Sequence, residues 1–323
     1  HFDLSKGKHM ENEQLEEYLG YLLEDYEKKY GIENHRNGNN NRFNDLIEVV
    51  YRKTGRQVVV LIDEYDAPLL DVAHEKEKLD DLRNTMRNFY SPLKGNESML
   101  RFVFMTGITK FSQLSIFSEL NNIKNVSMKL PYAGICGITK EELLTQMSDD
   151  IDELAENLEQ SREETIEELK SHYDGYHFCW PSPDVFNPYS LLNCFADGEI
   201  DSYWFGTGTP TYLINMMRQY DFLPADLGET IEVDKKDFDA PTETMTTIIP
   251  LLYQSGYVTI KGYDKPTKLY QLALPNQEIR VGLYGSLLPH YLTDESAKAN
   301  TTIAKMSVLV KKGDMEAAFS LLN

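Results

Sequence analysis

The stretch that most constrains the fold is a short, continuously apolar run that ends in two carboxylates. Val58–Ile62 is followed at once by Asp63 and Glu64. A run this short and without alternation is typical of a parallel strand that is buried on both faces. Open α/β sheets bind their ligands at the carboxyl ends of such strands, so the sequence predicts that both acids face a binding site.

A second run of the same kind predicts the next strand of the sheet. Leu100–Thr106 is apolar and ends in a polar residue, and the apolar positions of Glu75–Tyr90, between the two runs, recur at helical spacing. A strand, a helix and a second strand in this order form a βαβ unit. We therefore predict an α/β core over residues 1–137.

The same patterns predict the other elements of this core. The expected elements are the end of a strand at His1–Ser5, helices over Asn12–Tyr30 and Phe43–Thr54, a polar loop at His35–Asn41, and a last strand at Asn125–Leu130. With these elements the core would be a parallel sheet flanked by helices, the architecture of a P-loop NTPase.

Beyond residue 137 we predict three further parts. Thr139 and Glu142 form a capping box, which opens a helical lid subdomain over residues 138–204. Residues 205–292 are predicted to form a winged-helix-like α+β module, and residues 293–323 begin another helical segment. The elements expected in the module are helices over Pro210–Tyr220 and Thr242–Ser255, a hairpin over Tyr257–Leu274, and a helix from Glu278.

The Asp-Glu pair suits the hydrolysis of a phosphoanhydride. In P-loop NTPases, an aspartate at the end of this strand, the Walker B position, helps to hold Mg²⁺, and a following glutamate can orient the attacking water. Asp63 and Glu64 are the candidates for these roles, and Thr106 and Lys110 are the candidates for sensing the γ-phosphate after the next strand. Acidic residues also end many strands as helix caps or at a solvated edge, and that interpretation stays open.

The chain lacks the phosphate-binding loop that such chemistry requires. No G-x-x-x-x-G-K-[S/T] sequence occurs, and the nearest glycine-rich piece, residues 206–210, has no lysine. The chain begins at His1 and stops at Asn323 within an expected helix. We therefore expect a fragment of a longer protein, with a truncated, degenerate paralogue as the alternative.

Net charge limits the kinds of partner that the chain can bind, and the cysteine content and apolar runs indicate its compartment. The net charge is −20, so nonspecific binding of the nucleic-acid backbone by the whole surface is not expected. Glu141–Lys170 holds twelve acidic residues and two basic ones, and predicts solvated acidic helices. Three cysteines without a CxxC pair predict a reducing, cytoplasmic compartment, and no apolar run is long enough for a membrane span.

The segment His172–Phe178 places two histidines around an Asp-Gly pair. Zinc would require further cysteine or histidine ligands, so we predict a structural aromatic turn centred on Gly175 instead.

Six segments together carry a family resemblance. They are HFDLS at 1–5, VVVLIDEYDAPL at 58–69, FMTGITKFSQLSIFSELNNI at 104–123, YAGICGIT at 132–139, HYDGYHF at 172–178 and VFNPYSLLN at 185–193. Over residues 1–290 the chain resembles the AAA-ATPase-like family of bacterial P-loop NTPases, many of which carry a nuclease-like domain of the PD-(D/E)XK type. The resemblance implies ATP and Mg²⁺ as ligands, Asp63 as the metal-binding aspartate, Glu64 as its catalytic neighbour, and a sensor role for Thr106 and Lys110.

Two functional hypotheses follow. The first is an ATPase that acts as a nucleotide-dependent switch, with hydrolysis expected in the longer parent protein. The second is a non-catalytic scaffold, or a module whose winged helix binds protein or nucleic acid. Thr242–Ser255 has no lysine or arginine, which disfavours DNA and favours a protein partner or self-association.

Overall fold

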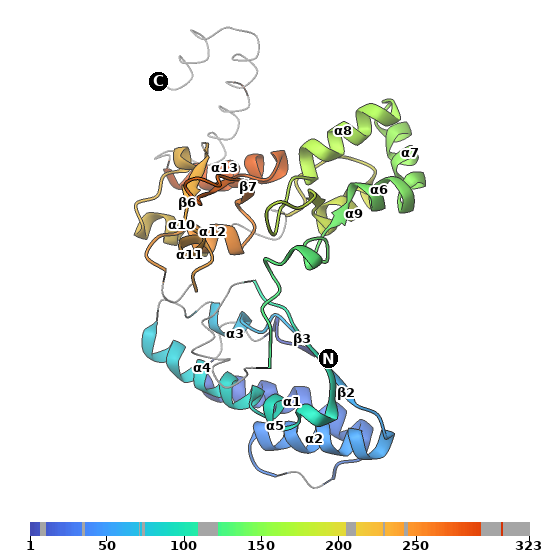
Figure 1. Cartoon of the computed structure of the whole chain (residues 1–323), viewed down its shortest axis with the longest axis vertical. Helices are drawn as coiled ribbons and strands as arrows, with labels where there is room; N and C mark the ends of the chain where they lie inside the picture. The colour runs from blue at the N-terminus through green and yellow to red at the C-terminus, as the bar shows by residue number, and fades with distance from the viewer. Residues whose placement is uncertain are drawn as a thin grey trace. The chain divides into compact units, whose positions relative to one another are not determined.

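The computed structural model describes residues 1–6, 11–33, 36–70, 72, 75–108, 122–204, 211–228, 230–241, 245–291 and 305 (Figure 1). The chain divides into two compact units. The first comprises residues 1–125 together with 236–255, and the second comprises residues 126–235 together with 256–323.

The first unit is built on a small parallel sheet. The strands are β1 (Phe2–Asp3), β2 (Val58–Asp63) and β3 (Leu100–Met105), in the order β1-β2-β3. Strand β2 is central, and its Ile62 is paired with Phe2 on one side and Met105 on the other. The strands predicted at His1–Ser5, Val58–Ile62 and Leu100–Thr106 and their parallel arrangement are confirmed.

Helices cover one face of this sheet (Figure 1). They are α1 (Asn12–Tyr30), α2 (Asn39–Thr54) and α4 (Lys76–Tyr90), with the short α3 (Ala67–Leu70), α5 (Pro92–Gly95) and 3₁₀ turn η1 (Glu97–Met99). Val60 and Ile62 point into a core formed with the apolar stripes of these helices, among them Leu19, Phe43 and Met86. The predicted helices over Asn12–Tyr30 and Glu75–Tyr90 are confirmed.

The opposite face of the sheet exposes large apolar side chains. Val59 is 51% exposed, Leu61 38% and Phe102 54%. The Phe102 ring stacks on that of Phe104, with 6.0 Å between the centroids. The prediction that β2 is buried on both faces was therefore wrong for this face, although parallel strands normally carry a cover on both.

Two predictions for the first 137 residues were wrong. Helix α2 begins at Asn39, inside the predicted polar loop, because the Asn39 amide donates to the Glu16 backbone carbonyl at 2.7 Å and anchors the first turn on α1. Asn125–Leu130 is not a strand. Its Lys129 N–H donates to the Val126 carbonyl at 3.0 Å and closes a turn, because three apolar residues in alternation form a strand only where a partner strand pairs with them.

The second unit opens with the predicted helical region. Strand β4 (Ile138–Thr139) pairs with β5 (Val185–Phe186), and the helices are α6 (Lys140–Gln146), α7 (Ser148–Asn157), α8 (Arg162–Tyr173) and α9 (Pro188–Asp197). The capping box of Thr139 and Glu142 is present, and Asn187 caps α9 ahead of Pro188, as predicted. A 3₁₀ turn, η2 (Leu130–Tyr132), precedes them.

The later elements match the prediction in part. The hairpin is confirmed as β7 (Thr259–Tyr263) and β8 (Tyr270–Ala273), and an unpredicted strand, β6 (Ile231–Val233), completes the order β6-β8-β7. The helices are α10 (Thr211–Gln219), α11 (Lys235–Phe238), α12 (Ile249–Gln254) and α13 (Gln277–Tyr291), with the 3₁₀ turn η4 (Pro224–Gly228).

Helix α12 is much shorter than the predicted Thr242–Ser255, because residues 246–248 bend and Pro250 sits in the first turn of the helix. The winged-helix assignment and the three-part division stay predictions. Among the described residues, no helix has both the length and the apolar character that crossing a bilayer requires.

Candidate functional site at the carboxyl edge of the sheet

Asp63 is the last residue of the central strand β2 and is exposed at the carboxyl edge of the sheet. Backbone hydrogen bonds continue to this point on both sides. The Leu4 N–H donates to the Asp63 carbonyl at 3.0 Å, and the Thr106 N–H donates to the Ile62 carbonyl at 2.9 Å. The parallel ladders therefore hold the three strand ends level with one another.

The side chains of Asp63 and Thr106 meet across this edge. The Thr106 hydroxyl donates a hydrogen bond to Asp63 Oδ1, and the Glu64 N–H donates to the same oxygen at 3.2 Å. Two donors on one oxygen hold the Asp63 carboxylate in a single orientation. The structure thus brings the Thr106 hydroxyl and the Glu64 backbone N–H onto the Asp63 carboxylate, whereas Lys110 lies outside the described residues.

Glu64 has a backbone conformation that is rare for a residue with a side chain. Its φ is 50°, in the left-handed region, and its carbonyl accepts the Ala67 N–H at 3.0 Å. Such a conformation costs about 1 kcal/mol or more and is found often at functional sites. It turns the chain sharply after β2, and the Glu64 side chain is half-buried.

The next two residues tie this turn to the end of β3. The Tyr65 N–H donates to the Thr106 carbonyl at 2.9 Å, and the Ile108 N–H donates to Asp66 Oδ1 at 3.1 Å. Asp66 has no exposed surface. Its contact with the loop after β3 was not predicted, because nothing in the spacing of the two segments indicates it.

The oxygen atoms at this edge fit a magnesium ion better than a transition metal. Among the described residues, no group of three or more histidine, cysteine or acidic side chains could hold a metal by itself. Mg²⁺ does not need such a cage, since it binds through one or two carboxylates, waters and substrate phosphates. Asp63 with the neighbouring Glu64 supplies donors of that class.

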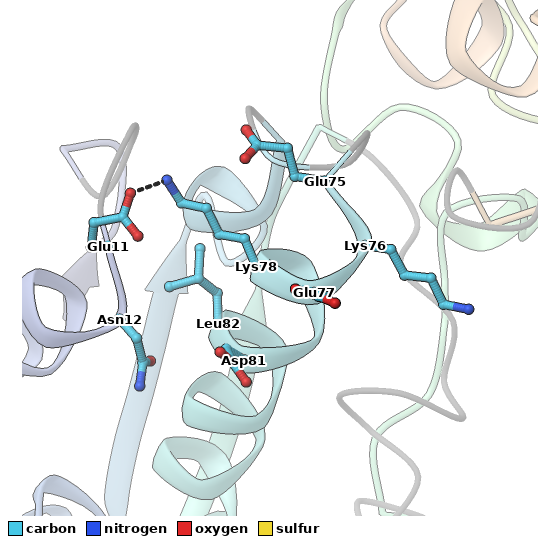
Figure 2. Close-up of a pocket in the computed structure, with 8 residues that line it drawn as sticks. All are labelled: Glu11, Asn12, Glu75, Lys76, Glu77, Lys78, Asp81 and Leu82. Atoms are coloured by element: carbon cyan, nitrogen blue, oxygen red, sulfur yellow. Dashed lines mark hydrogen bonds and ion pairs between the residues drawn. The ribbon is translucent and has the colours of Figure 1, made fainter.

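A cavity of about 480 Å³ lies between the N-terminal ends of α1 and α4 (Figure 2). Its lining consists of Glu11, Asn12, Glu75, Lys76, Glu77, Lys78, Asp81 and Leu82, and the Lys78 ammonium forms an ion pair with Glu11. Four acids against two lysines repel a polyphosphate. The acids instead suit the positive ends of the two helix dipoles, so we assign no ligand to this cavity.

The aromatic turn at residues 172–178 packs within the second unit. Gly175 has a φ of 97°, and a β-carbon there would lie 2.6 Å from the Pro275 carbonyl oxygen. The Lys261 ammonium donates to the Gly175 carbonyl at 2.6 Å and to that of Pro275 at 3.0 Å. Burial lowers the pKa of Lys261 and raises the pKa of Asp174. These contacts give the turn a structural role, as predicted.

Comparison with known proteins links the first part of the chain to a family. Residues 1–117 match the AAA-ATPase-like family model, described as predicted AAA-ATPase. The chain is 31% identical over 295 residues to an uncharacterized protein encoded in the vnfD 5′ region of Azotobacter chroococcum mcd 1, covering 89% of this chain and 54% of that protein. The chain therefore spans about half the length of this curated relative. No solved structure matches the chain. Over residues 1–117, the chain thus matches the AAA-ATPase-like family.

Proposed function

We propose that Asp63, Glu64 and Thr106 form the metal- and water-positioning part of an ATPase site that is complete in the full-length protein. The observation that carries this proposal is the contact of the exposed Asp63 carboxylate, at the end of the central parallel strand, with a hydroxyl from the end of the next strand. Ligands of open α/β sheets bind at this edge.

Each residue has a role that follows from its position. Asp63 would hold Mg²⁺, which neutralises charge on the β- and γ-phosphate oxygens of bound ATP. The Thr106 hydroxyl keeps the Asp63 carboxylate in one orientation. Glu64, which follows Asp63 in a left-handed turn, would orient the attacking water. Lys110, four residues beyond Thr106 in the sequence, would contact the γ-phosphate.

The uncovered face of the sheet supports the proposal that another part of the full-length protein carries the phosphate-binding loop. Val59, Leu61 and Phe102 expose apolar surface that a parallel sheet normally buries under a helix. The chain itself has no phosphate-binding loop. We propose that another strand–helix unit of the full-length protein covers this face and carries that loop, and the greater length of the curated relative leaves room for it.

At the level of the whole protein we propose a nucleotide-dependent switch. The net charge of −20 and the absence of lysine and arginine from Ile249–Gln254 favour a protein partner or self-association over DNA as the output.

Calorimetric titration with Mg-ATP tests the ATPase proposal. We expect the 323-residue chain to bind ATP weakly or not at all, because it lacks the loop that cradles the phosphates. We expect the full-length protein to bind in the micromolar range and to hydrolyse ATP. In the full-length protein, Asp63→Asn should lower the hydrolysis rate about 100-fold or more, with Mg²⁺ dependence altered.

Two results would count against the proposal. Tight binding by the 323-residue chain would show that the phosphates do not need a further unit. A full-length protein that neither binds nor hydrolyses ATP would leave the scaffold hypothesis as the better account. Glu77→Gln, in the acidic cavity of Figure 2, is the matched control and should leave ATP binding unchanged.

A further inference from the structure

The loop that follows β3 is held by a buried carboxylate from the loop that follows β2. The Ile108 N–H donates to Asp66 Oδ1 at 3.1 Å, and Asp66 is completely buried. The backbone carbonyl of Asp66 accepts the N–H of Leu69 at 2.9 Å and that of Leu70 at 3.2 Å, so the first turn of α3 fixes the residue in place. Asp66 is therefore a rigid anchor for the loop after β3.

Gly107 lets the loop approach this anchor closely. A β-carbon at Gly107 would lie 2.4 Å from Asp66 Oδ1 and 2.6 Å from the Tyr65 ring. Both distances are too short for a contact between non-bonded atoms. The Tyr65 backbone has a hydrogen bond of its own, because the buried Tyr90 hydroxyl donates to the Tyr65 carbonyl at 3.4 Å. The two loops thus fit together without space for a side chain between them.

Thr106 lies inside this fitted pair of loops. Its N–H donates to Ile62, its carbonyl accepts from Tyr65, and its hydroxyl donates to Asp63. The bond from Ile108 to Asp66 fixes the chain two residues further on. Without that bond, the hydrogen bonds of Thr106 itself would be the last to fix the chain after β3. The orientation of the Thr106 side chain would then be less well defined.

We propose that Asp66 is a positioning residue for the site formed by Asp63, Glu64 and Thr106. It holds residues 106–108 so that the Thr106 hydroxyl stays on the Asp63 carboxylate, and it acts through these residues without touching nucleotide. This inference rests on the proposed ATPase function for its catalytic consequence, but its structural part stands on the described contacts alone.

Amide hydrogen exchange in the 323-residue chain tests the structural part. Asp66→Ala removes the acceptor of the Ile108 N–H, so exchange at Ile108 should become about tenfold faster or more. Asp66→Asn keeps an acceptor oxygen and should restore protection. Asp63→Asn leaves the anchor intact and should leave Ile108 close to the parent rate. Equal exchange at Ile108 in the parent chain and in Asp66→Ala would overturn the proposal.

Steady-state kinetics of the full-length protein test the catalytic part. Asp66→Ala should lower kcat on the order of 10- to 100-fold, raise the Mg²⁺ concentration needed for half-maximal rate, and leave KM for ATP within about threefold. Asp66→Asn should recover most of kcat. A merely structural residue would instead lower the amount of folded enzyme and leave kcat per folded molecule and the Mg²⁺ dependence unchanged.

A second variant covers the case in which Asp66→Ala does not fold. Gly107→Ala leaves Asp66 in place but drives the loop away from it, so it should produce the same loss of kcat and the same faster exchange at Ile108. Thermal unfolding of each variant reports whether it is folded. A full-length protein without any ATP hydrolysis would refute the proposed function, whereas an active protein that tolerates both variants would refute only this inference.

Discussion

Glu278 shows how a single buried carboxylate sets a pH dependence in this chain. The side chain has no exposed surface, and it accepts the Trp204 N–H at 2.9 Å. Burial raises its pKa above the ordinary value of 4.5. The opposite case is the exposed Glu142, whose pKa is lowered because the Thr139 backbone N–H donates to it in the capping box. The sign of the stability effect therefore differs between the two acids.

Replacing Glu278 by glutamine should stabilise the protein at neutral pH. The folded state holds the proton of Glu278 more tightly than the unfolded state, so its contribution to the free energy of unfolding falls as pH rises from 4.5 through the raised pKa. Glu278→Gln stays neutral and keeps an acceptor oxygen. We expect a gain in the free energy of unfolding on the order of 1 kcal/mol at pH 7, and none at pH 4.

Urea unfolding at both pH values measures this gain. Glu142→Gln is the control and should behave oppositely, with a loss at pH 7 that disappears on acidification below the lowered pKa. A Glu278→Gln variant that is less stable than the parent at pH 7 would show that the hydrogen bond to the carboxylate outweighs the cost of burying its charge.

At the scale of elements, the pairing of α1 with α2 depends on a buried ion pair. Arg42 Nη2 lies 2.7 Å from Glu27 Oε2, its Nε donates to Oε1 at 2.9 Å, and the same guanidinium donates to the Gly20 carbonyl at 2.9 Å. The Glu27 side chain is 4% exposed. An acid this buried is tolerated because the guanidinium meets both of its oxygens.

Removing this arginine should destabilise the first unit strongly. Arg42→Ala leaves Glu27 buried without its cation, which costs roughly 3–5 kcal/mol. Arg52→Ala removes an exposed pair with Glu48 on the same helix and should cost about 0.5 kcal/mol or less. Thermal unfolding of both variants gives the comparison. Equal, small losses would mean that Glu27 is protonated or rehydrated when Arg42 is absent.

At the scale of the whole molecule, the uncovered sheet face is the largest departure from an ordinary parallel sheet. One face of the sheet exposes the side chains of Val59, Leu61 and Phe102, which a core strand would bury. The other face is packed against the helices in the usual way. A helix that covered this face would stabilise the protein substantially, because each such side chain contributes about 1.5–3 kcal/mol to the free energy of unfolding when it is fully buried.

Thiol labelling tests whether this face is covered in the full-length protein. In a background with the exposed Cys136 replaced by serine, Phe102→Cys should react quickly with a maleimide in the 323-residue chain and at least about tenfold more slowly in the full-length protein. Tyr21→Cys, at a position 60% exposed on α1, is the control and should react alike in both. Equal reaction at Phe102→Cys would rule out a cover on this face.

The patterns of the sequence determined the local structure well. Helices such as Asn12–Tyr30 and the strand Val58–Asp63 were predicted because apolar periodicity and capping residues act over a few neighbouring positions. The motif also indicated Asp63, Glu64 and Thr106 as residues of one site, since strands of a βαβ unit end at the same edge of the sheet.

The tertiary structure decided every feature that depends on contacts between distant segments. Helix α2 starts at Asn39 because the Asn39 side-chain amide donates a hydrogen bond to the Glu16 carbonyl. Strand β6 forms because it pairs with the edge of β8. Asp66 holds Ile108 across 42 positions of sequence, a distance over which no local pattern carries information. The turn at Lys129, where a strand was predicted, has the same origin, because whether an apolar residue joins a sheet depends on a partner strand that local sequence does not specify.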